Sequence, residues 1–346
     1  MNRLIRALVV DDSAFARKTV REMLSRNPYI DVVGTARDGS EAIELVQQLD
    51  PDVVVCDLVM PRLDGVCFVR EQMSRKPLPI ILLSMAEKDA EQVLSALEAG
   101  AIDFVRKPTA LATNDLLRIR EELVEKVKAA AQASRRRFAL QSMPTVLPAK
   151  PKKKVSGRIA AVLIGISTGG PQALRFLMPQ FPSDFPVPIA IVLHMPVGFT
   201  ALYAAKLNES TQLTVKEAEE GDEMRPGLAL VAQAGRHLVL RRAAGGQVTA
   251  HLVLQPAESL HRPSVDVLFH SAAEVYGERV LGVVMTGMGN DGKEGAAWIK
   301  AQGGTVLTET EETCVIYGMP RSVVEAGLSD AAVPLNRLAQ TIMDRI

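Results

Sequence analysis

A serine lies at a sharp turn between an apolar run and a glycine-rich segment. The run 159–166 ends at Ser167, and two glycines and Pro171 follow. Because proline suits the first turn of a helix, this pattern predicts a strand-to-helix turn with a hydroxyl at its apex. Residues 165–169 also have the G-x-S-x-G spacing of a nucleophile elbow, whose backbone N–H groups can stabilise an oxyanion. A purely structural turn is the alternative, since short glycine-serine turns are common.

Two further apolar runs end near residues that could complete a catalytic triad. The run 187–193 is followed by His194, and the run 280–285 is followed by a glycine-rich segment that contains Asp291. Residues beyond the carboxyl ends of strands line the crevice of open α/β sheets, so we expect these side chains and Ser167 at one edge. Histidine can take the serine proton, and a carboxylate can fix the histidine tautomer. The order Ser, His, Asp differs from that of α/β-hydrolases, so the roles fit a triad but the topology does not fit that fold.

Oxygen ligands follow the apolar runs of the N-terminal third in the same way. Asp11 and Asp12 follow the first run, Asp57 the third, Ser84 the fourth and Lys107 the fifth. Three carboxylates at one edge repel one another unless a cation joins them, and a set of oxygen ligands favours Mg²⁺. Ser84 and Lys107 could then contact a phosphoryl group on Asp57. The alternative for each acid is a helix N-cap or a solvated strand end.

The elements that must position these residues follow from the apolar pattern. Five short apolar runs alternate with helical segments such as 41–49 and 91–99, which predicts a parallel sheet with helices on both faces. The predicted strands are 4–10, 30–35, 52–56, 79–83 and 102–106. The fold class is therefore α/β in this third.

Residues between the two halves read as a linker. The segment 116–139 has helical spacing, and 141–157 carries three prolines and three consecutive lysines, which predicts an extended chain. The basic residues could suggest nucleic-acid binding, but no aromatic residues are interleaved, so a solvated linker is favoured.

The second half continues with short strands and two helices. We expect strands within 213–253, helices over 265–275 and 294–301, and a loop-to-helix junction at 317–320. Asp266 is expected to stabilise the helix start after Ser264. The remaining histidines lack metal-ligand spacing, so no zinc site is expected.

Length and composition limit the classes of protein to which this chain can belong. A length of 346 residues suggests two domains, and 47% hydrophobic residues are ample for buried cores. Lys+Arg and Asp+Glu number 40 each, which argues against a dedicated nucleic-acid binder. Three scattered cysteines suit a reducing compartment. We expect no signal peptide, no membrane insertion and a cytoplasmic protein.

The blocks around the predicted triad resemble those of the CheB chemotaxis methylesterases. The blocks are residues 165–170, 194–200, 261–266 and 286–292. The resemblance implies a Rossmann-like methylesterase domain in which Ser167 is the nucleophile, His194 the general base and Asp291 its partner. Thr168 and the backbone at Met288 are implied to hold the oxyanion. Ile166 stands where relatives usually carry alanine, and we expect this buried position to repack without loss of chemistry. Arg262 is expected to meet an acidic receptor segment or to form a loop ion pair.

The N-terminal half resembles a response-regulator receiver domain. The resemblance makes Asp57 the phosphoacceptor and places Asp11, Asp12 and the Val59 carbonyl around Mg²⁺. Ser84 and Lys107 are implied to contact the phosphoryl oxygens. Val59 departs from the methylesterase pattern, where an acidic residue is usual, so the lifetime of the phosphoryl group is left open.

Together the two resemblances imply a phosphorylation-regulated serine hydrolase of two-component signalling. It has two doubly wound parallel-sheet domains, a receiver at 1–125 and a methylesterase domain at 158–346, with the linker at 126–157. The implied reactions are hydrolysis of glutamate methyl esters and deamidation of glutamines on methyl-accepting chemoreceptors, in adaptation during chemotaxis. Mg²⁺ serves phosphorylation, hydrolysis needs no cofactor, and a sensor histidine kinase is the phosphodonor.

We also expect a monomer whose receiver inhibits the hydrolase until it is phosphorylated, because both sites lie at sheet edges and a linker of this length lets the receiver pack over the Ser167 cleft. A phospho-regulated interaction protein with an inactive esterase half is the alternative, and the intact Ser, His and Asp set counts against it. A transcription factor is excluded because the second half shows no helix-turn-helix and no basic excess.

Overall fold

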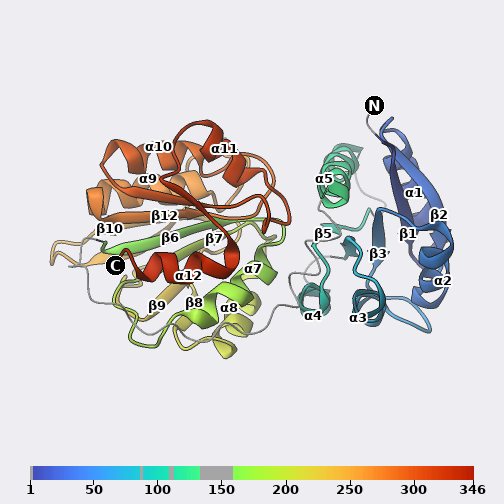
Figure 1. Cartoon of the computed structure of the whole chain (residues 1–346), viewed down its shortest axis with the longest axis horizontal. Helices are drawn as coiled ribbons and strands as arrows, with labels where there is room; N and C mark the ends of the chain where they lie inside the picture. The colour runs from blue at the N-terminus through green and yellow to red at the C-terminus, as the bar shows by residue number, and fades with distance from the viewer. Residues whose placement is uncertain (1–2, 86–88, 109–112, 133–158) are drawn as a thin grey trace. The chain divides into compact units, whose positions relative to one another are not determined.

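The computed structural model describes residues 3–85, 89–108, 113–132 and 159–346 (Figure 1). The chain divides into two compact units, Met1–Met143 and Pro144–Ile346. Within the described ranges, no helix combines the length and the apolar character needed to cross a membrane.

The first unit is a five-stranded parallel sheet with the order β2-β1-β3-β4-β5. Its strands are β1 (Ile5–Val10), β2 (Ile30–Ala36), β3 (Val53–Asp57), β4 (Ile80–Ser84) and β5 (Asp103–Arg106). Its helices are α1 (Ala14–Ser25), α2 (Gly39–Leu49), α3 (Gly65–Arg75), α4 (Ala90–Ala99) and α5 (Thr113–Gln132). Helices α1 and α5 contact one another, as do α3 and its neighbours α2 and α4, so helices cover both faces of the sheet (Figure 1).

Apolar continuity and helix caps explain these elements. Every residue of β3 and β4 is buried, as expected for strands covered on both faces. The side chains of Ser13, Asp38 and Asp64 accept hydrogen bonds from the first-turn amides of α1, α2 and α3 and so start these helices. The five predicted strands are all present, with ends that differ by one residue. The predicted helix 116–139 begins earlier, at Thr113, and residues 133–139 and the segment 141–157 lie outside the described residues.

The second unit is a seven-stranded parallel sheet with the order β14-β13-β12-β6-β7-β9-β8. Its strands are β6 (Ala161–Ile166), β7 (Ile189–Leu193), β8 (Thr214–Glu217), β9 (Leu228–Val231), β12 (Val280–Val284), β13 (Thr305–Glu309) and β14 (Ala331–Val333). An antiparallel pair, β10 (His237–Arg242) and β11 (Val248–Val253), lies beside helix α9.

Helices cover both faces of this sheet. The helices are α7 (Gly170–Leu177), α8 (Thr200–Glu209), α9 (Val265–Tyr276), α10 (Lys293–Ala301), α11 (Met319–Glu325) and α12 (Leu335–Met343). In Figure 1, α9, α10 and α11 lie on one face and α7, α8 and α12 on the other. The two predicted helices in this half and the junction at 317–320 are confirmed, and both units are doubly wound α/β sheets as predicted.

The order of the strands reverses direction at the centre of the second sheet. From β6 the chain continues to β7 on one side, while β12 and β13 build the sheet on the other side. Ligands of open α/β sheets bind beyond the carboxyl ends of the strands at such a switch point. The residues that follow β6, β7 and β12 therefore meet where this fold forms its crevice.

Candidate active site

Backbone hydrogen bonds join the three segments that carry the predicted triad. The Ser167 amide donates to the Thr286 carbonyl over 3.0 Å, and the His194 amide donates to the Ile166 carbonyl over 3.2 Å. Parallel hydrogen bonding thus extends past the end of β6 at Ser167 and past the end of β7 at His194. At the start of α7, the Gly170 amide donates to the Ser167 carbonyl over 2.7 Å. These bonds fix the backbone of Ser167 relative to the segments that contain His194 and Asp291.

Two glycines make the turn around Ser167 possible. Gly169 has a φ of +80°, and a Cβ atom there would lie 2.7 Å from the Val315 side chain. Gly287, after β12, packs against the nucleophile side: a Cβ atom there would lie 2.8 Å from the Ser167 Cβ and would overlap Met319. The strand-turn-helix geometry that the G-x-S-x-G spacing predicts is therefore present, and the loop after β12 packs against it at Gly287.

His194 and Asp291 form a buried pair. The His194 Nε2 lies 2.8 Å from the Asp291 Oδ2, and each side chain is 8% exposed. Because a carboxylate only accepts hydrogen bonds, Nε2 carries the proton and Nδ1 is the basic nitrogen. Nδ1 is buried and has no hydrogen-bond partner among the described residues. The ring is thus held in the tautomer that can accept a proton from a hydroxyl.

Helix α9 supplies the other partners of Asp291. Its carboxylate accepts hydrogen bonds from the Ser264 hydroxyl (2.9 Å) and from the Val265 (2.8 Å) and Asp266 (2.9 Å) amides. Burial acts to raise the pKa of Asp291, but the hydrogen bonds from His194 and from these amides outweigh it and hold the pKa well below its usual range. Asp291 therefore stays ionised beside the histidine.

Asp266 lies in the first turn of α9, at the helix start after Ser264 where we expected it to act. Its Oδ1 in addition accepts hydrogen bonds from the amides of Gly292 (2.9 Å) and Gly295 (2.6 Å) at the start of α10. Ser264 itself is the N-cap of α9. Burial raises the pKa of Asp266 to about 7, and the nearby Asp291 charge adds to this shift. Sequence spacing alone does not reveal this exchange, because it depends on the two helices starting side by side.

A second histidine covers the ring of His194. The His261 ring stacks on it with centroids 4.1 Å apart and 16° between the planes, and His261 is exposed. The neighbouring Arg262 donates to the Ala257 carbonyl over 3.2 Å, while its Nε is buried and has no hydrogen-bond partner among the described residues. In the described part of the chain Arg262 forms no ion pair, so the loop ion pair is not observed.

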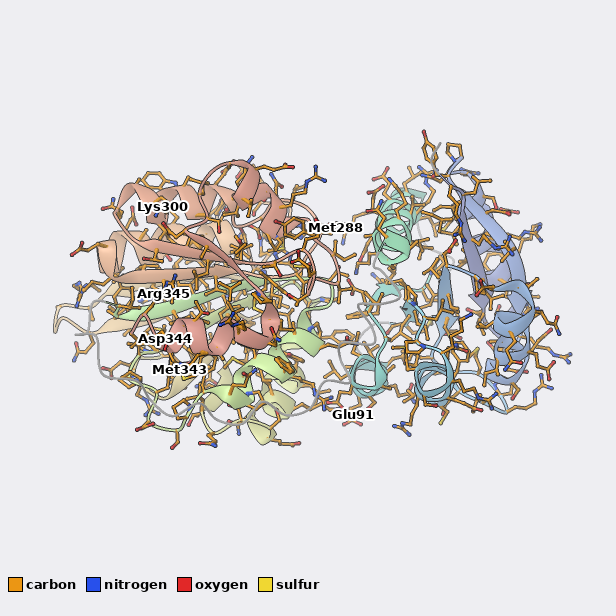
Figure 2. The ribbon with its side chains drawn as sticks, viewed as in Figure 1. Glu91, Met288, Lys300, Met343, Asp344 and Arg345 are labelled. Carbon is orange, nitrogen blue, oxygen red and sulfur yellow. The ribbon has the colours of Figure 1, made fainter. Side chains whose placement is uncertain are left out.

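One predicted oxyanion residue, Thr168, lies in the Ser167 turn, and the other, Met288, lies on the loop that packs against this turn at Gly287. Thr168 is buried, and its carbonyl accepts a hydrogen bond from the Thr286 hydroxyl over 2.9 Å. Met288, labelled in Figure 2, lies on the loop that connects β12 to α10 and is partly exposed. The carbonyl that precedes it, on Gly287, accepts from the amides of Gly318 and Met319. The Met288 backbone is therefore held next to the nucleophile turn.

The first unit brings its predicted acids together at the carboxyl edge of its sheet. Asp11, Asp12 and Asp57 each offer a carboxylate oxygen, and these atoms lie within 4.8 Å of one another. The Lys107 Nζ lies 2.7 Å from Asp57 and 2.9 Å from Asp11. Burial raises the pKa of Asp57 to about 6, and the Lys107 hydrogen bond limits the rise. One lysine cannot balance three carboxylates, so this set of hard oxygen ligands fits Mg²⁺.

Ser84 and Val59 lie next to this cluster in the chain. Ser84 is buried at the end of β4, where its carbonyl accepts from the Lys107 amide over 2.7 Å. Its hydroxyl donates to the Asp89 carboxylate over 3.3 Å. Our sequence analysis did not name Asp89 as a site residue, and its position as the N-cap of α4 is the only sequence feature that could have indicated it. The Val59 side chain is exposed two residues beyond Asp57.

Each of the two units matches a known protein family. Residues 162–342, more than half of the chain, match the CheB methylesterase family, and residues 7–118 match the response regulator receiver domain. The chain belongs to the CheB methylesterase family. Its two α/β units are thus a receiver domain and a methylesterase domain, as the resemblance implied.

Relatives in this family match over nearly their whole length. A protein-glutamate methylesterase/protein-glutamine glutaminase of Myxococcus xanthus is 48% identical over 333 residues, 96% of this chain and 95% of the relative. A protein of the same name from Pyrococcus horikoshii is 41% identical over 352 residues, 100% of this chain and 95% of the relative. The crystal structure of the Thermotoga maritima CheB methylesterase catalytic domain is 42% identical with a TM-score of 0.53, and covers 54% of this chain and 99% of its own.

Proposed function

We propose that this CheB family member hydrolyses glutamate methyl esters on chemoreceptors and deamidates glutamines there, under control of phosphorylation at Asp57. The observation that carries the proposal is the buried pair of His194 and Asp291, in which Nδ1, beside the Ser167 turn, has no hydrogen-bond partner among the residues that the structure describes. The choice of substrate is supported by the relatives, whose names give both activities and whose sequences match 96% and 100% of this chain.

In the proposed mechanism His194 Nδ1 takes the proton of Ser167 as the hydroxyl oxygen attacks the ester carbonyl. The Met288 amide and the Thr168 side chain stabilise the tetrahedral oxyanion. When the intermediate collapses, the ester bond breaks and His194 returns the proton to the departing methanol. A water molecule, deprotonated by His194, then releases the glutamate carboxylate from Ser167. With a glutamine substrate the same steps release ammonia.

Asp291 prepares His194 for both proton transfers. Its charge stabilises the imidazolium that forms during the attack, and its hydrogen bond from Nε2 keeps Nδ1 as the basic atom. Because four hydrogen bonds hold the carboxylate in place, it stays ionised while His194 gains and loses its proton.

The receiver part of the proposal assigns roles to the strand-end residues of the first sheet. Asp57 accepts the phosphoryl group from a sensor histidine kinase. Asp11, Asp12, Asp57 and the Val59 carbonyl would hold Mg²⁺, which offsets the carboxylate charge against the incoming anion. Ser84 and Lys107 contact the phosphoryl oxygens. The proposal assigns residues 1–125 to the receiver and residues 158–346 to the esterase, joined by the linker 126–157.

The proposal places a monomeric enzyme in the cytoplasm, where the kinase acts and where three free cysteines stay reduced. An interaction protein with an inactive esterase half is disfavoured by the pairing of His194 with Asp291. The decisive experiment measures methanol release from methylated chemoreceptor membranes by the full chain, with and without a small-molecule phosphodonor. Release that the phosphodonor accelerates and that Ser167→Ala abolishes is expected. Equal release by wild type and Ser167→Ala would exclude the proposed reaction.

A further inference from the structure

A glutamate is buried next to the Thr286 segment of the proposed active site. Glu309 is the last residue of β13 and is fully buried. Its Oε2 accepts from the Thr286 amide and its Oε1 accepts from the Thr313 hydroxyl, each over 2.9 Å. The Cys314 thiol also hydrogen-bonds to it. In the described part of the chain no lysine, arginine or histidine forms an ion pair with this carboxylate.

Such a residue is costly for the fold. Removing a carboxylate from water is unfavourable unless a counter-charge or several hydrogen bonds compensate. The donors to Glu309 within the described ranges are all neutral, and burial raises its pKa to about 7. A neutral side chain of similar size would avoid this cost, so stability alone does not account for a glutamate here.

Thr286, whose amide bonds to Glu309, connects this glutamate to the backbone of the Ser167 turn by further hydrogen bonds. The Thr286 carbonyl accepts from the Ser167 amide over 3.0 Å. The Thr286 hydroxyl donates to the Thr168 carbonyl over 2.9 Å and accepts from the Ile316 amide over 3.0 Å. Every polar group of Thr286 is therefore engaged, and the Thr286 amide relies on the Glu309 carboxylate.

We propose that Glu309 is a positioning residue of the esterase site: by anchoring the Thr286 amide, its carboxylate keeps the backbone of Ser167 and Thr168 in the register that catalysis needs. The inference rests on the proposed hydrolase function. Glu309 touches no reacting atom and acts only through Thr286. Its effect should therefore fall on kcat rather than on KM, because small displacements of a nucleophile slow the chemical step.

The ionisation of Glu309 gives the proposal a distinctive readout. An ionised carboxylate is a stronger acceptor than a carboxylic acid, so its hold on the Thr286 amide strengthens as the pH rises through about 7. Besides the donors Thr286 and Thr313, which do not titrate, only the Cys314 thiol faces this carboxylate among the described residues. The kcat of the wild type should thus contain one ionisation that a glutamine variant lacks.

The test compares the full chain with Glu309→Ala, Glu309→Gln and the control Glu312→Gln, an exposed glutamate three residues further along. Each protein is treated with phosphodonor, and methanol release from methylated chemoreceptor membranes is measured as kcat and KM between pH 6 and 9. We expect kcat of Glu309→Ala to fall at least about tenfold while KM changes less than about twofold. Glu309→Gln, which keeps an acceptor for the Thr286 amide, should recover kcat to within about threefold at pH 8.

The glutamine variant should also lose the ionisation near pH 7 that wild type and Glu312→Gln share, while the pH dependence due to the general base remains in all three. A folded Glu309→Ala with wild-type kcat, or a Glu309→Gln with the wild-type pH profile, overturns the inference. If Glu309→Ala does not fold, the pH profile of Glu309→Gln decides alone. Ser167→Ala is assayed in parallel: wild-type release no greater than that of Ser167→Ala overturns the hydrolase function itself, and with it the role of Glu309.

Discussion

The carboxylates of Asp266 and Asp291 each hold the start of the other's helix. Asp291 precedes Gly292, the N-cap of α10, and accepts from the first amides of α9. Asp266, in the first turn of α9, accepts from the Gly292 and Gly295 amides at the start of α10. Both carboxylates thus lie at the positive ends of two helices. This exchange fixes the loop that presents Asp291 to His194 from both sides.

We therefore predict a difference between two substitutions of Asp266. Asp266→Ala removes the acceptor for the Gly292 and Gly295 amides, and should lower the free energy of unfolding of the esterase unit by about 1 kcal/mol. It should also lower kcat, because the Asp291 loop loses one of its two anchors. Asp266→Asn keeps an oxygen acceptor, so its stability and kcat should lie closer to wild type. Urea unfolding and methanol release measure both effects, and identical results for the two variants would contradict this role.

The proposed triad predicts non-additive mutants. Ser167→Ala and His194→Ala should each lower kcat by several orders of magnitude, and the double mutant should lose little more, because the two residues share one step. Asp291→Asn should lose less than either. Rates of methanol release from the four proteins test this, with phosphorylation of Asp57 as a control that none should change. Losses that multiply in the double mutant would mean that the two side chains act in separate steps.

Gly287 provides a steric test of the site. A Cβ atom there would lie 2.8 Å from the Ser167 Cβ, so Gly287→Ala should displace the nucleophile and reduce kcat by about tenfold or more. Gly245→Ala is a matched control, because the added methyl meets only the flexible end of the Gln247 side chain in an exposed turn. The assay is again methanol release. Wild-type kcat in Gly287→Ala would show that Ser167 does not need its observed position.

Phosphorylation should depend on the acid cluster and on its cation. The full chain should become labelled by a small-molecule phosphodonor in Mg²⁺ and not in chelator, because three carboxylates repel the incoming anion. Asp57→Asn should remove the label, and Lys107→Ala should keep metal binding but lose the acceleration of methanol release. Metal affinity can be followed separately by isothermal titration calorimetry. Label in Asp57→Asn, or equal labelling in chelator, would place the phosphoryl group elsewhere.

The burial of Glu309 predicts how stability changes with pH. Its pKa is raised from 4.5 to about 7 in the folded protein, so folding favours its protonated form. That contribution is fully present below about pH 4.5 and is lost as the pH rises through about 7. Glu309→Gln should therefore gain stability relative to wild type between pH 5 and pH 8, by up to about 3 kcal/mol. Thermal or urea unfolding across this range provides the measurement. A stability difference that does not change with pH would mean that Glu309 does not titrate in the folded state.

Much of the fold and of the two sites follows from the sequence, because parallel strands deliver their carboxyl ends to one edge of a sheet. The buried runs that end at Ser167, His194 and Asp57 are long enough to be recognised as strands, and the polar residue after each run is therefore placed at the edge. Helix starts such as Ser264 are also local, since a cap needs only its own first turn. The receiver acids and the residues of the proposed triad could be named on these grounds.

The tertiary structure alone decided which polar groups meet across the edge. Strand order brings β12 next to β6 and β13 next to β12, and only then does the Glu309 carboxylate reach the Thr286 amide, and Thr286 reach Ser167. The exchange between Asp266 and Asp291 likewise requires α9 and α10 to begin side by side. The periodicity of apolar residues indicates whether a residue is buried. A hydrogen-bond partner distant in sequence depends on strand order and register, and no local sequence pattern encodes these.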